Sequence, residues 1–331
     1  MRPLSSVPAP DAQAVADWKH LYTDARAWTP LLAEILRRER LGTLDSVEVG
    51  VPGSNAVFIV NGRLVVKIQW PHYLDDLPRE LEAHRLLEPH REVRAPRVLA
   101  AGAVESELTW HYLIQERLPG RSLGEVRGHL PRRDLDTIAS ALGEMIAVLH
   151  ALPVPTAGPL TGDCEQWFGF LQAQVERAAQ HHAPSLTQAP HLLSELPSYL
   201  AGAMPLAPPD FRLAVLHCDL TADHVLVAER EGGWRVTGLI DFGDVMAGHA
   251  DYEWIALHLD CFAADAALTQ RFLRSYGYGA LDEAFPRRLT AYSFLHRFGD
   301  AGFVLGAVGG PRAVGSLAGL ERRLWGPVLT G

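Results

Sequence analysis

The chain has 331 residues, of which 48% are hydrophobic and 21% are charged, and this is enough apolar sequence for two separately packed lobes. The formal net charge of −9 argues against a nucleic-acid partner, because phosphate contacts need clustered Lys and Arg side chains. The three cysteines are far apart in the sequence and form no CxxC pair, which argues against a zinc site and fits a reducing compartment.

The first elements predicted along the chain are a helix and an antiparallel sheet. The N-terminal residues lack the apolar run of a secretory signal and no later run has the length of a membrane span, so we expect a cytoplasmic protein without a membrane partner. An apolar stripe predicts a helix over about residues 11–41. Residues 47–70 then divide into three strand-like runs, which are separated by a turn at 52–55 and by the hairpin signal Asn61-Gly62.

The rest of the chain changes character near Pro119-Gly120. Before it, LPRELEAHRLLEPH predicts a helix, and PRVLAAGAV and LTWHYLIQERL predict strands, so residues 1–117 form an α+β lobe. After it, RRDLDTIASALGEMIAVLH and DCEQWFGFLQAQVERAAQHH are amphipathic and predict helices. Two strands follow over 224–229 and 234–241, and residues 250–331 read as helices. Residues 118–331 are therefore expected to form a mainly helical second lobe.

Two features of the first lobe are typical of a nucleotide phosphate site. The turn containing Gly53 and Ser54 joins two strands, so its backbone N–H groups are placed to cover phosphates, although such turns are usually only structural. Lys67 lies mid-strand among apolar neighbours, where it either points to solvent from an edge strand or reaches a buried anion. Glu80 follows on the next helix, and an ion pair between Lys67 and Glu80 would hold the ammonium against phosphates.

Two features of the second lobe are typical of phosphoryl transfer. Asp219 follows a short strand in LHCDLTADHVLV, where a carboxylate can accept the proton of an attacking hydroxyl, although a single His-x-Asp is more often structural. Asp241 ends the apolar strand of GLIDFGD, where it fits a Mg²⁺ ligand that bridges phosphates. The order of turn, lysine, glutamate, His-x-Asp loop and Asp-Phe-Gly indicates a kinase-like phosphotransferase.

These motifs resemble those of the aminoglycoside phosphotransferase and small-molecule kinase family. HCDLTADHVLV resembles that family's HGDxxxxNxLV loop, GLIDFGD its xxIDFxD strand, and GEMIAVLHALP the helix ending in LHxLP. The resemblance implies a bilobal protein-kinase-like fold that uses ATP or GTP together with Mg²⁺. Further stretches, VPGSNAVFIV, LHLDCF, FLHRF and LWGP, resemble the members that phosphorylate the 7″-hydroxyl of hygromycin B, whereas residues 155–210 match poorly.

The resemblance also implies a role for each matching residue. Asp219 becomes the catalytic base and Asp241 the Mg²⁺ ligand, while Lys67 becomes the phosphate-binding lysine with Glu80 as its partner. His224 stands where relatives have a metal-binding Asn. It either ligates the ion or holds a water or Asp219 by a hydrogen bond, and we favour the hydrogen bond. The backbone groups expected to bind adenine or guanine lie at the hinge, at Gln115, Glu116 and Leu118.

Aminoglycosides and related aminocyclitols are polycations, so for such acceptors the resemblance implies carboxylates near the accepting hydroxyl. The candidates, each of which is more often a helix cap or a solvated side chain, are Asp251, Glu253, Asp260 and Asp300. The sequence therefore predicts an O-phosphotransferase whose partners are a nucleotide and a small hydroxylated aminoglycoside or aminocyclitol such as hygromycin B, acting by direct in-line transfer. The alternatives are a kinase of another small sugar or amino alcohol, or a nucleotide-binding pseudokinase, which His224 and the sparse glycine turn motivate.

Overall fold

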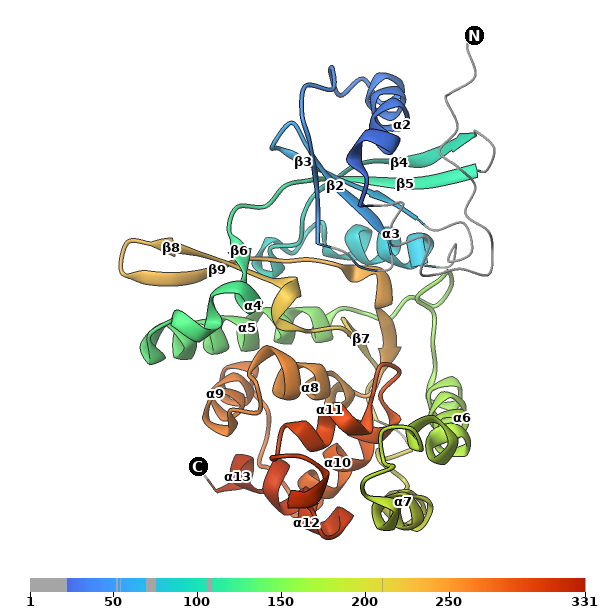
Figure 1. Cartoon of the computed structure of the whole chain (residues 1–331), viewed down its shortest axis with the longest axis vertical. Helices are drawn as coiled ribbons and strands as arrows, with labels where there is room; N and C mark the ends of the chain where they lie inside the picture. The colour runs from blue at the N-terminus through green and yellow to red at the C-terminus, as the bar shows by residue number, and fades with distance from the viewer. Residues whose placement is uncertain are drawn as a thin grey trace. The chain divides into compact units, whose positions relative to one another are not determined.

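The computed structural model describes residues 23–51, 53, 55–69, 76–105, 109–209 and 211–330 (Figure 1). Ser54 and the first part of the helix expected over 11–41 lie outside the described residues. The chain divides into two compact units, Met1–Glu88 with Ala95–Leu118 and Pro89–Arg94 with Pro119–Gly331. Among the described residues, no helix combines the length and the hydropathy that crossing a membrane requires.

The first unit is built on a five-stranded sheet with the order β1-β2-β3-β5-β4, in which all neighbours are antiparallel. Its strands are β1 (Val47–Val49), β2 (Ala56–Val60), β3 (Leu64–Ile68), β4 (Val98–Glu105) and β5 (Thr109–Glu116). Asn61 and Gly62 join β2 to β3 with φ values of 52° and 63°, the left-handed conformation that a tight hairpin needs. The antiparallel sheet predicted from the sequence is confirmed.

Two helices of this unit pack on opposite faces of the sheet. Helix α2 (Ala25–Arg38) begins at Asp24, whose carboxylate accepts the N–H of Arg26, and it packs Trp28 5.1 Å from the ring of Trp110. The side chains of β3 alternate, so Val66 faces this core and Lys67 points to the other face. Helix α3 (Asp76–Leu87) lies along that other face (Figure 1), and its buried residues include Glu80 and His84.

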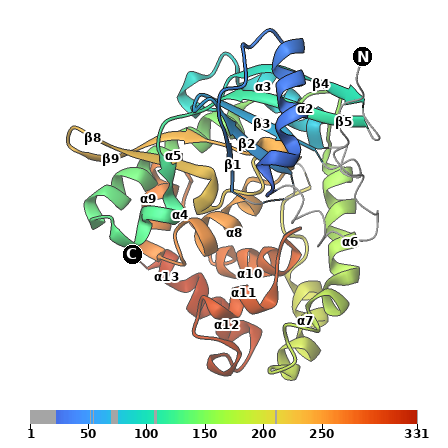
Figure 2. The same ribbon diagram turned by 45° about the horizontal axis from the view of Figure 1, so that its top comes forward.

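The second unit is mainly helical, as predicted. Its helices are α4 (Leu123–Val126), α5 (Arg132–Ala151), α6 (Cys164–His182), α7 (Pro190–Ala203), α8 (Trp254–Ala256), α9 (Ala266–Tyr276), α10 (Phe285–Leu295), α11 (Ala301–Gly306), α12 (Leu317–Leu324) and α13 (Gly326–Leu329). Helix α5 packs along α9, where Gly143 permits a close approach because a Cβ there would lie 2.4 Å from the carbonyl oxygen of Phe272. Helices α10 to α13, in the C-terminal part of the chain, pack together (Figure 2).

Five short strands of the second unit position its polar loops. They are β6 (Arg121–Ser122), β7 (Ala214–Leu216), β8 (Val225–Arg230), β9 (Gly233–Leu239) and β10 (Met246–Gly248). Strand β7 pairs antiparallel with β10, and β8 pairs antiparallel with both β6 and β9. The loop 217–224 connects β7 to β8, and residue 241 follows β9. Because the N–H of Ile240 donates to the carbonyl of His224 at 3.0 Å, this loop and Asp241 lie at the same end of the β8–β9 hairpin.

Candidate active site

The ion pair predicted in the first unit is present. The Nζ atom of Lys67 lies 2.8 and 3.0 Å from the two carboxylate oxygens of Glu80, and the two side chains are 7% and 2% exposed. His84 lies one helical turn after Glu80 on the same face of α3, with its Nε2 3.9 Å from the carboxylate and 2.7 Å from the side-chain amide of Gln115. A buried line of polar groups therefore fixes the lysine and joins β3, α3 and β5.

The other candidates for nucleotide binding in this unit occupy the turn and the end of β5. Among the described residues, none outside the immediate chain neighbours of Gly53 has a heavy atom within 4 Å of the position that a Cβ would take. Glu116 accepts the N–H of Arg97 at 3.1 Å, and its own N–H donates to the Arg97 carbonyl at 3.0 Å. Leu118 ends the first unit and is half-buried. The role of these residues in binding a base or phosphate stays a prediction.

The fully buried His217 supports the polar loop that follows β7. Its Nε2 donates to the carbonyl of Ile240 at 3.0 Å and so ties the loop to the segment before Asp241. Burial lowers the pKa of His217, so the ring is neutral at neutral pH. His217 therefore supports the loop, and Asp219 two residues later is the carboxylate that reaches the surface, with 26% of its side chain exposed.

Glu253 was predicted to face an acceptor, and this placement is wrong. Its carboxylate is fully buried, and it accepts hydrogen bonds from the backbone N–H groups of His217 at 2.6 Å and Cys218 at 3.0 Å. A third contact joins it to Nε2 of His150 at 3.3 Å. The two backbone contacts hold the loop from inside the unit, and the contact with His150 joins the carboxylate to α5. His150 was not predicted from the sequence, although it ends the helix of the GEMIAVLHALP stretch.

Asp260 braces the same loop from another side. Its Oδ1 accepts the N–H of Ala222 at 2.8 Å, and it lies on a π-helical turn over Leu257–Cys261, a feature that is frequent at functional sites. Arg127 donates to the carbonyls of Asp260 and Cys261, the latter at 2.9 Å. Asp260 is thus a second carboxylate that holds the loop backbone, and Arg127 was not predicted because its partners are more than a hundred residues away.

Asp219, His224 and Asp241 lie close together at this loop. The Nδ1 of His224 lies 2.7 Å from the carbonyl oxygen of Asp219 and 3.4 Å from its Oδ2, and its Nε2 lies 3.5 Å from Oδ2 of Asp241. Burial raises the pKa of Asp219, an effect that His224 opposes and the charges of Asp241 and Asp260 reinforce. A carboxylate with a raised pKa is a better proton acceptor near neutral pH.

The residues at this centre fit a divalent ion that is bound partly by the protein and partly by the phosphates of a nucleotide. Among the described residues, no group of three or more His, Cys, Asp and Glu side chains is arranged to enclose a metal ion. Mg²⁺ is usually bound through only one or two carboxylates, because water and substrate phosphates complete its octahedron. Asp241 would supply such a carboxylate, and 40% of its side chain is exposed. Its backbone has a φ of 65°, a strained left-handed conformation of the kind found at functional sites.

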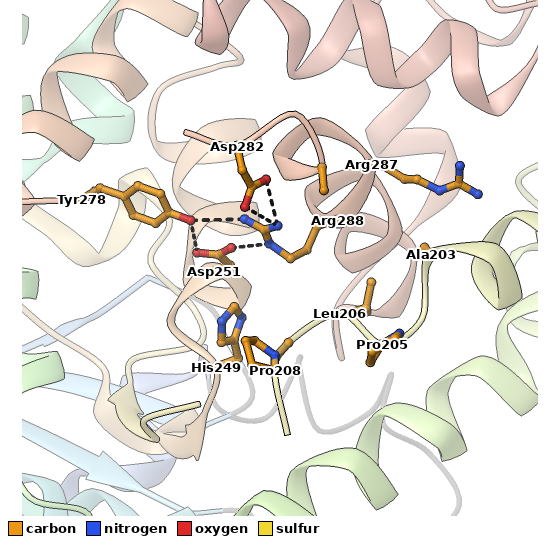
Figure 3. Close-up of a pocket in the computed structure, with 12 residues that line it drawn as sticks. Ala203, Pro205, Leu206, Pro208, His249, Asp251, Tyr278, Asp282, Arg287 and Arg288 are labelled. Carbon is orange, nitrogen blue, oxygen red and sulfur yellow. Dashed lines mark hydrogen bonds and ion pairs between the residues drawn. The ribbon is translucent and has the colours of Figure 1, made fainter. Parts of the chain in front are cut away.

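Asp251 lies at a separate cavity of about 440 Å³ within the second unit (Figure 3). Its buried carboxylate accepts hydrogen bonds from Trp254 at 3.1 Å, Tyr278 at 2.8 Å and Arg288 at 2.6 Å. Arg288 also pairs with Asp282 at 3.2 Å. The facing wall is largely apolar and contains Ala203, Pro205, Leu206, Ala207 and Pro208. The charge of Asp251 is therefore already balanced inside the cavity wall.

Asp300 does not join the loop carboxylates. It is the N-cap of α11, where it accepts the N–H of Phe303 at 3.0 Å, and it also accepts the hydroxyl of Ser185. Hydrogen bonds from Ser185 and from the backbone hold the pKa of Asp300 below its usual range. These contacts are those of a helix cap, and the structure brings Asp219, His224, Asp241 and Asp260 together without it.

Comparisons with known proteins agree with this fold. Among solved structures, the GDP and kanamycin complex of APH(2″)-IIIa has a TM-score of 0.64 at 22% identity, covering 80% of this chain and 88% of that one. The streptomycin–ATP complex of APH(2″)-IIa has a TM-score of 0.56 at 17% identity, covering 86% and 94%. A thermostable mutant of APH(4)-Ia has a TM-score of 0.59 at 18% identity, covering 89% and 98%. At these identities the likeness concerns the fold, and it confirms the bilobal protein-kinase-like architecture.

A curated relative and a family match complete the comparison. The lysine-specific demethylase JMJ21 of Arabidopsis thaliana is 22% identical over 240 residues, which is 59% of this chain and 24% of that protein. The chain thus spans about a quarter of the length of that relative. The sequence pattern of the phosphotransferase enzyme family matches residues 48–289, a range that includes Lys67, Glu80, the 217–224 loop and Asp241. Because this match covers well over half of the chain, the protein belongs to the phosphotransferase enzyme family.

Proposed function

We propose that this protein is a cytoplasmic small-molecule kinase that transfers the γ-phosphoryl group of ATP or GTP directly to an acceptor hydroxyl. The observation that carries the proposal is the placement of Asp219, on the 217–224 loop, beside His224 and Asp241. The backbone of this loop is held by the buried carboxylate of Glu253 and the half-buried carboxylate of Asp260. Such bracing is what a reaction that depends on positioning requires.

Each group has a separate task in this proposal. Asp219 orients the acceptor hydroxyl and takes its proton as the new O–P bond forms and the bond between the γ-phosphorus and the bridging oxygen breaks. Lys67 neutralises phosphate charge and is held for this purpose by Glu80. Asp241 binds the nucleotide's divalent ion, normally Mg²⁺, which supplies further positive charge to the phosphates. The turn at Gly53 and Ser54 and the hinge at 115–118 contribute backbone groups.

A multi-ring aminoglycoside or aminocyclitol such as hygromycin B is the first acceptor class. Asp219 lies beyond one end of β7, and Ala214 at the other end pairs with Gly248, which His249 at the cavity follows directly. Two of the solved structures named above are complexes of similar proteins with kanamycin and streptomycin, which supports this class.

A second acceptor class, a neutral sugar or an amino alcohol, is favoured by the charges of the cavity. Asp251 and Asp282 both pair with Arg288, and Arg287 also lines the cavity, so the wall offers little net negative charge to a polycation. The two classes differ in the number of amino groups that they present to this wall. An acceptor panel should therefore include hygromycin B, kanamycin, neutral sugars and amino alcohols.

The test is acceptor-dependent turnover of ATP and GTP with each panel member, followed by identification of the phosphorylated hydroxyl by mass spectrometry and NMR. We expect Asp219→Asn to lower turnover by about 10²- to 10⁴-fold while nucleotide affinity stays nearly unchanged. Nucleotide binding without turnover for any acceptor, with Mg²⁺ or Mn²⁺, would favour a pseudokinase. A large loss of nucleotide affinity in the Asp219→Asn variant would contradict its assignment as the base.

Resistance provides an independent measurement. If hygromycin B is the acceptor, expression in a sensitive bacterium raises the concentration needed for growth inhibition, and expression of the Asp219→Asn variant does not. Equal sensitivity of both strains, together with turnover of a neutral acceptor in vitro, would select the second acceptor class.

A further inference from the structure

The ring of His224 is held in one orientation by its Nδ1. This atom lies 2.7 Å from the carbonyl oxygen of Asp219, and a carbonyl oxygen can only accept, so Nδ1 carries the hydrogen. The hydroxyl of Thr221 lies 3.2 Å from the same nitrogen. The backbone of His224 is fixed as well, because its N–H donates to the Thr221 carbonyl at 3.2 Å and its carbonyl accepts the N–H of Ile240. These contacts fix both the position and the tautomer of the His224 ring.

This tautomer gives Nε2 a lone pair on the side of Asp241. The distance from Nε2 to Oδ2 of Asp241 is 3.5 Å, and only 18% of the His224 side chain is exposed. Neighbouring ligands of an octahedral ion, each about 2.1 Å from the metal, lie about 3 Å apart. The two atoms are therefore already close to the separation that a shared ion would need. A histidine that binds a metal almost always donates its other N–H to a carbonyl or carboxylate, as His224 does.

We propose that His224 supplies an imidazole nitrogen to the divalent ion shared with Asp241, and that this ligand shifts the preference of the enzyme from Mg²⁺ toward Mn²⁺ and Co²⁺. The inference rests on the proposed phosphotransferase function. Mg²⁺ favours oxygen ligands, whereas the affinity of nitrogen ligands rises along the first-row divalent ions from Mn²⁺ to Co²⁺. Our preference from the sequence alone, a hydrogen-bonding role for His224, is met by Nδ1, and the metal-binding role falls to Nε2.

The competing arrangement is a doubly protonated His224 that bridges Asp219 and Asp241. Its Nδ1 lies 3.4 Å from Oδ2 of Asp219 and its Nε2 3.5 Å from Oδ2 of Asp241, so an imidazolium would contact both carboxylates. The two arrangements differ in one observable property. A metal ligand places a histidine nitrogen in direct contact with the ion, and an imidazolium excludes that contact.

The test is pulsed electron paramagnetic resonance of the Mn²⁺·ADP and Mn²⁺·GDP complexes of protein labelled with ¹⁵N-histidine. The nucleotide contributes unlabelled nitrogen, so only a histidine ligand gives a ¹⁵N coupling of the size of a directly bound nitrogen. We expect this coupling in the wild type and its loss in His224→Asn, which restores an oxygen ligand and still binds the Mn²⁺·nucleotide. The exposed His129→Asn is the matched control, and it should retain the coupling.

Metal competition gives a second measurement. We expect His224→Asn to lower the ratio of Mn²⁺ to Mg²⁺ affinity at least about tenfold, since loss of even a group that only supports a metal ligand typically costs 10- to 100-fold. A bound Mn²⁺·nucleotide without a histidine coupling in the wild type, or an unchanged affinity ratio in the variant, would overturn the inference and leave phosphotransfer intact. A protein that binds neither nucleotide would refute the proposed function, and the inference with it.

Discussion

The carboxylate of Glu253 accepts the backbone N–H of His217 at 2.6 Å and thereby fixes the loop two residues before Asp219. Burial by itself would raise the pKa of Glu253, but the hydrogen bond from His150 and the neighbouring backbone donor together hold that pKa below its usual range. Glu253 is therefore a charged acceptor at neutral pH. The next loop residue, Cys218, has a φ of 67°, a conformation that costs free energy in a non-glycine residue and persists because the surrounding contacts fix it.

Replacing Glu253 with Gln should destabilise the protein. The amide keeps the shape of the side chain but turns one acceptor oxygen into a donor that faces a backbone N–H or His150. We expect the free energy of unfolding to fall by about 3 kcal/mol, as measured by urea denaturation at pH 7. The exposed Glu229→Gln on β8 is the control and should change it by less than about 0.5 kcal/mol. Equal stability of the two variants would show that the buried charge is not needed.

The contact of Asp260 with Ala222 predicts a pair of variants with different outcomes. Asp260→Asn keeps an oxygen that can accept the Ala222 N–H, so kcat should stay near the wild-type value. Asp260→Ala removes it, and the loss of about one hydrogen bond should lower kcat roughly tenfold with little change in the KM for nucleotide. If Asp260 instead binds a cationic acceptor directly, both variants would raise the KM for that acceptor.

A site residue on a strand could be predicted from the sequence more reliably than a buried side chain that holds a loop of the site in place. The period of two along β3 places Lys67 opposite Val66 and Ile68, and the helix that follows must cover that face, so Glu80 was identifiable as a partner. No comparable local pattern exists for Glu253, whose contact with His217 spans 36 positions in sequence. Its contact with His150 on α5 spans 103 positions, so only the three-dimensional structure reveals either partner.

Two further elements show why some secondary structure was not predicted. Helix α7 contains Pro197 in its interior, and proline normally ends a helix because it lacks an N–H and clashes with the preceding turn. Strands β6 and β10 have two and three residues, which is too short for an alternating pattern. Strand β10 nevertheless matters, since its pairing with β7 sets the positions of both the loop and Asp251.

Variants of the Lys67–Glu80 pair distinguish its contribution to stability from its role in nucleotide binding. Lys67→Met removes the lysine charge from the buried Glu80 carboxylate and should cost about 3–5 kcal/mol of the free energy of unfolding. The double variant Lys67→Met/Glu80→Met removes both charges and should lie within about 1–2 kcal/mol of the wild type. Neither should bind ATP or GTP with wild-type affinity in a direct titration. A stable double variant that binds nucleotide normally would exclude Lys67 as a phosphate ligand.

His258 should make the protein less stable in mild acid. Its Nδ1 lies 2.7 Å from Thr269 Oγ1 and its Nε2 lies 3.2 Å from the Leu324 carbonyl, and burial lowers its pKa from 6.5 to about 4. The unfolded chain binds this proton near pH 6.5 and the folded protein only near pH 4, so the free energy of unfolding falls as the pH drops between these values. For this one group the fall approaches about 3 kcal/mol, and His296, whose pKa burial also lowers to about 4, adds to it.

The measurement is the free energy of unfolding at several pH values from 7 to 4.5, determined by urea denaturation for the wild type and for His258→Gln. The Gln side chain can replace a neutral hydrogen-bonding group but does not titrate, so the variant should be less stable at pH 7 and should lose less stability on acidification. The exposed His129→Gln should retain the wild-type pH dependence. If His258→Gln also retained it, the native protein would have to bind a proton at His258 as readily as the unfolded chain, against the burial of that ring.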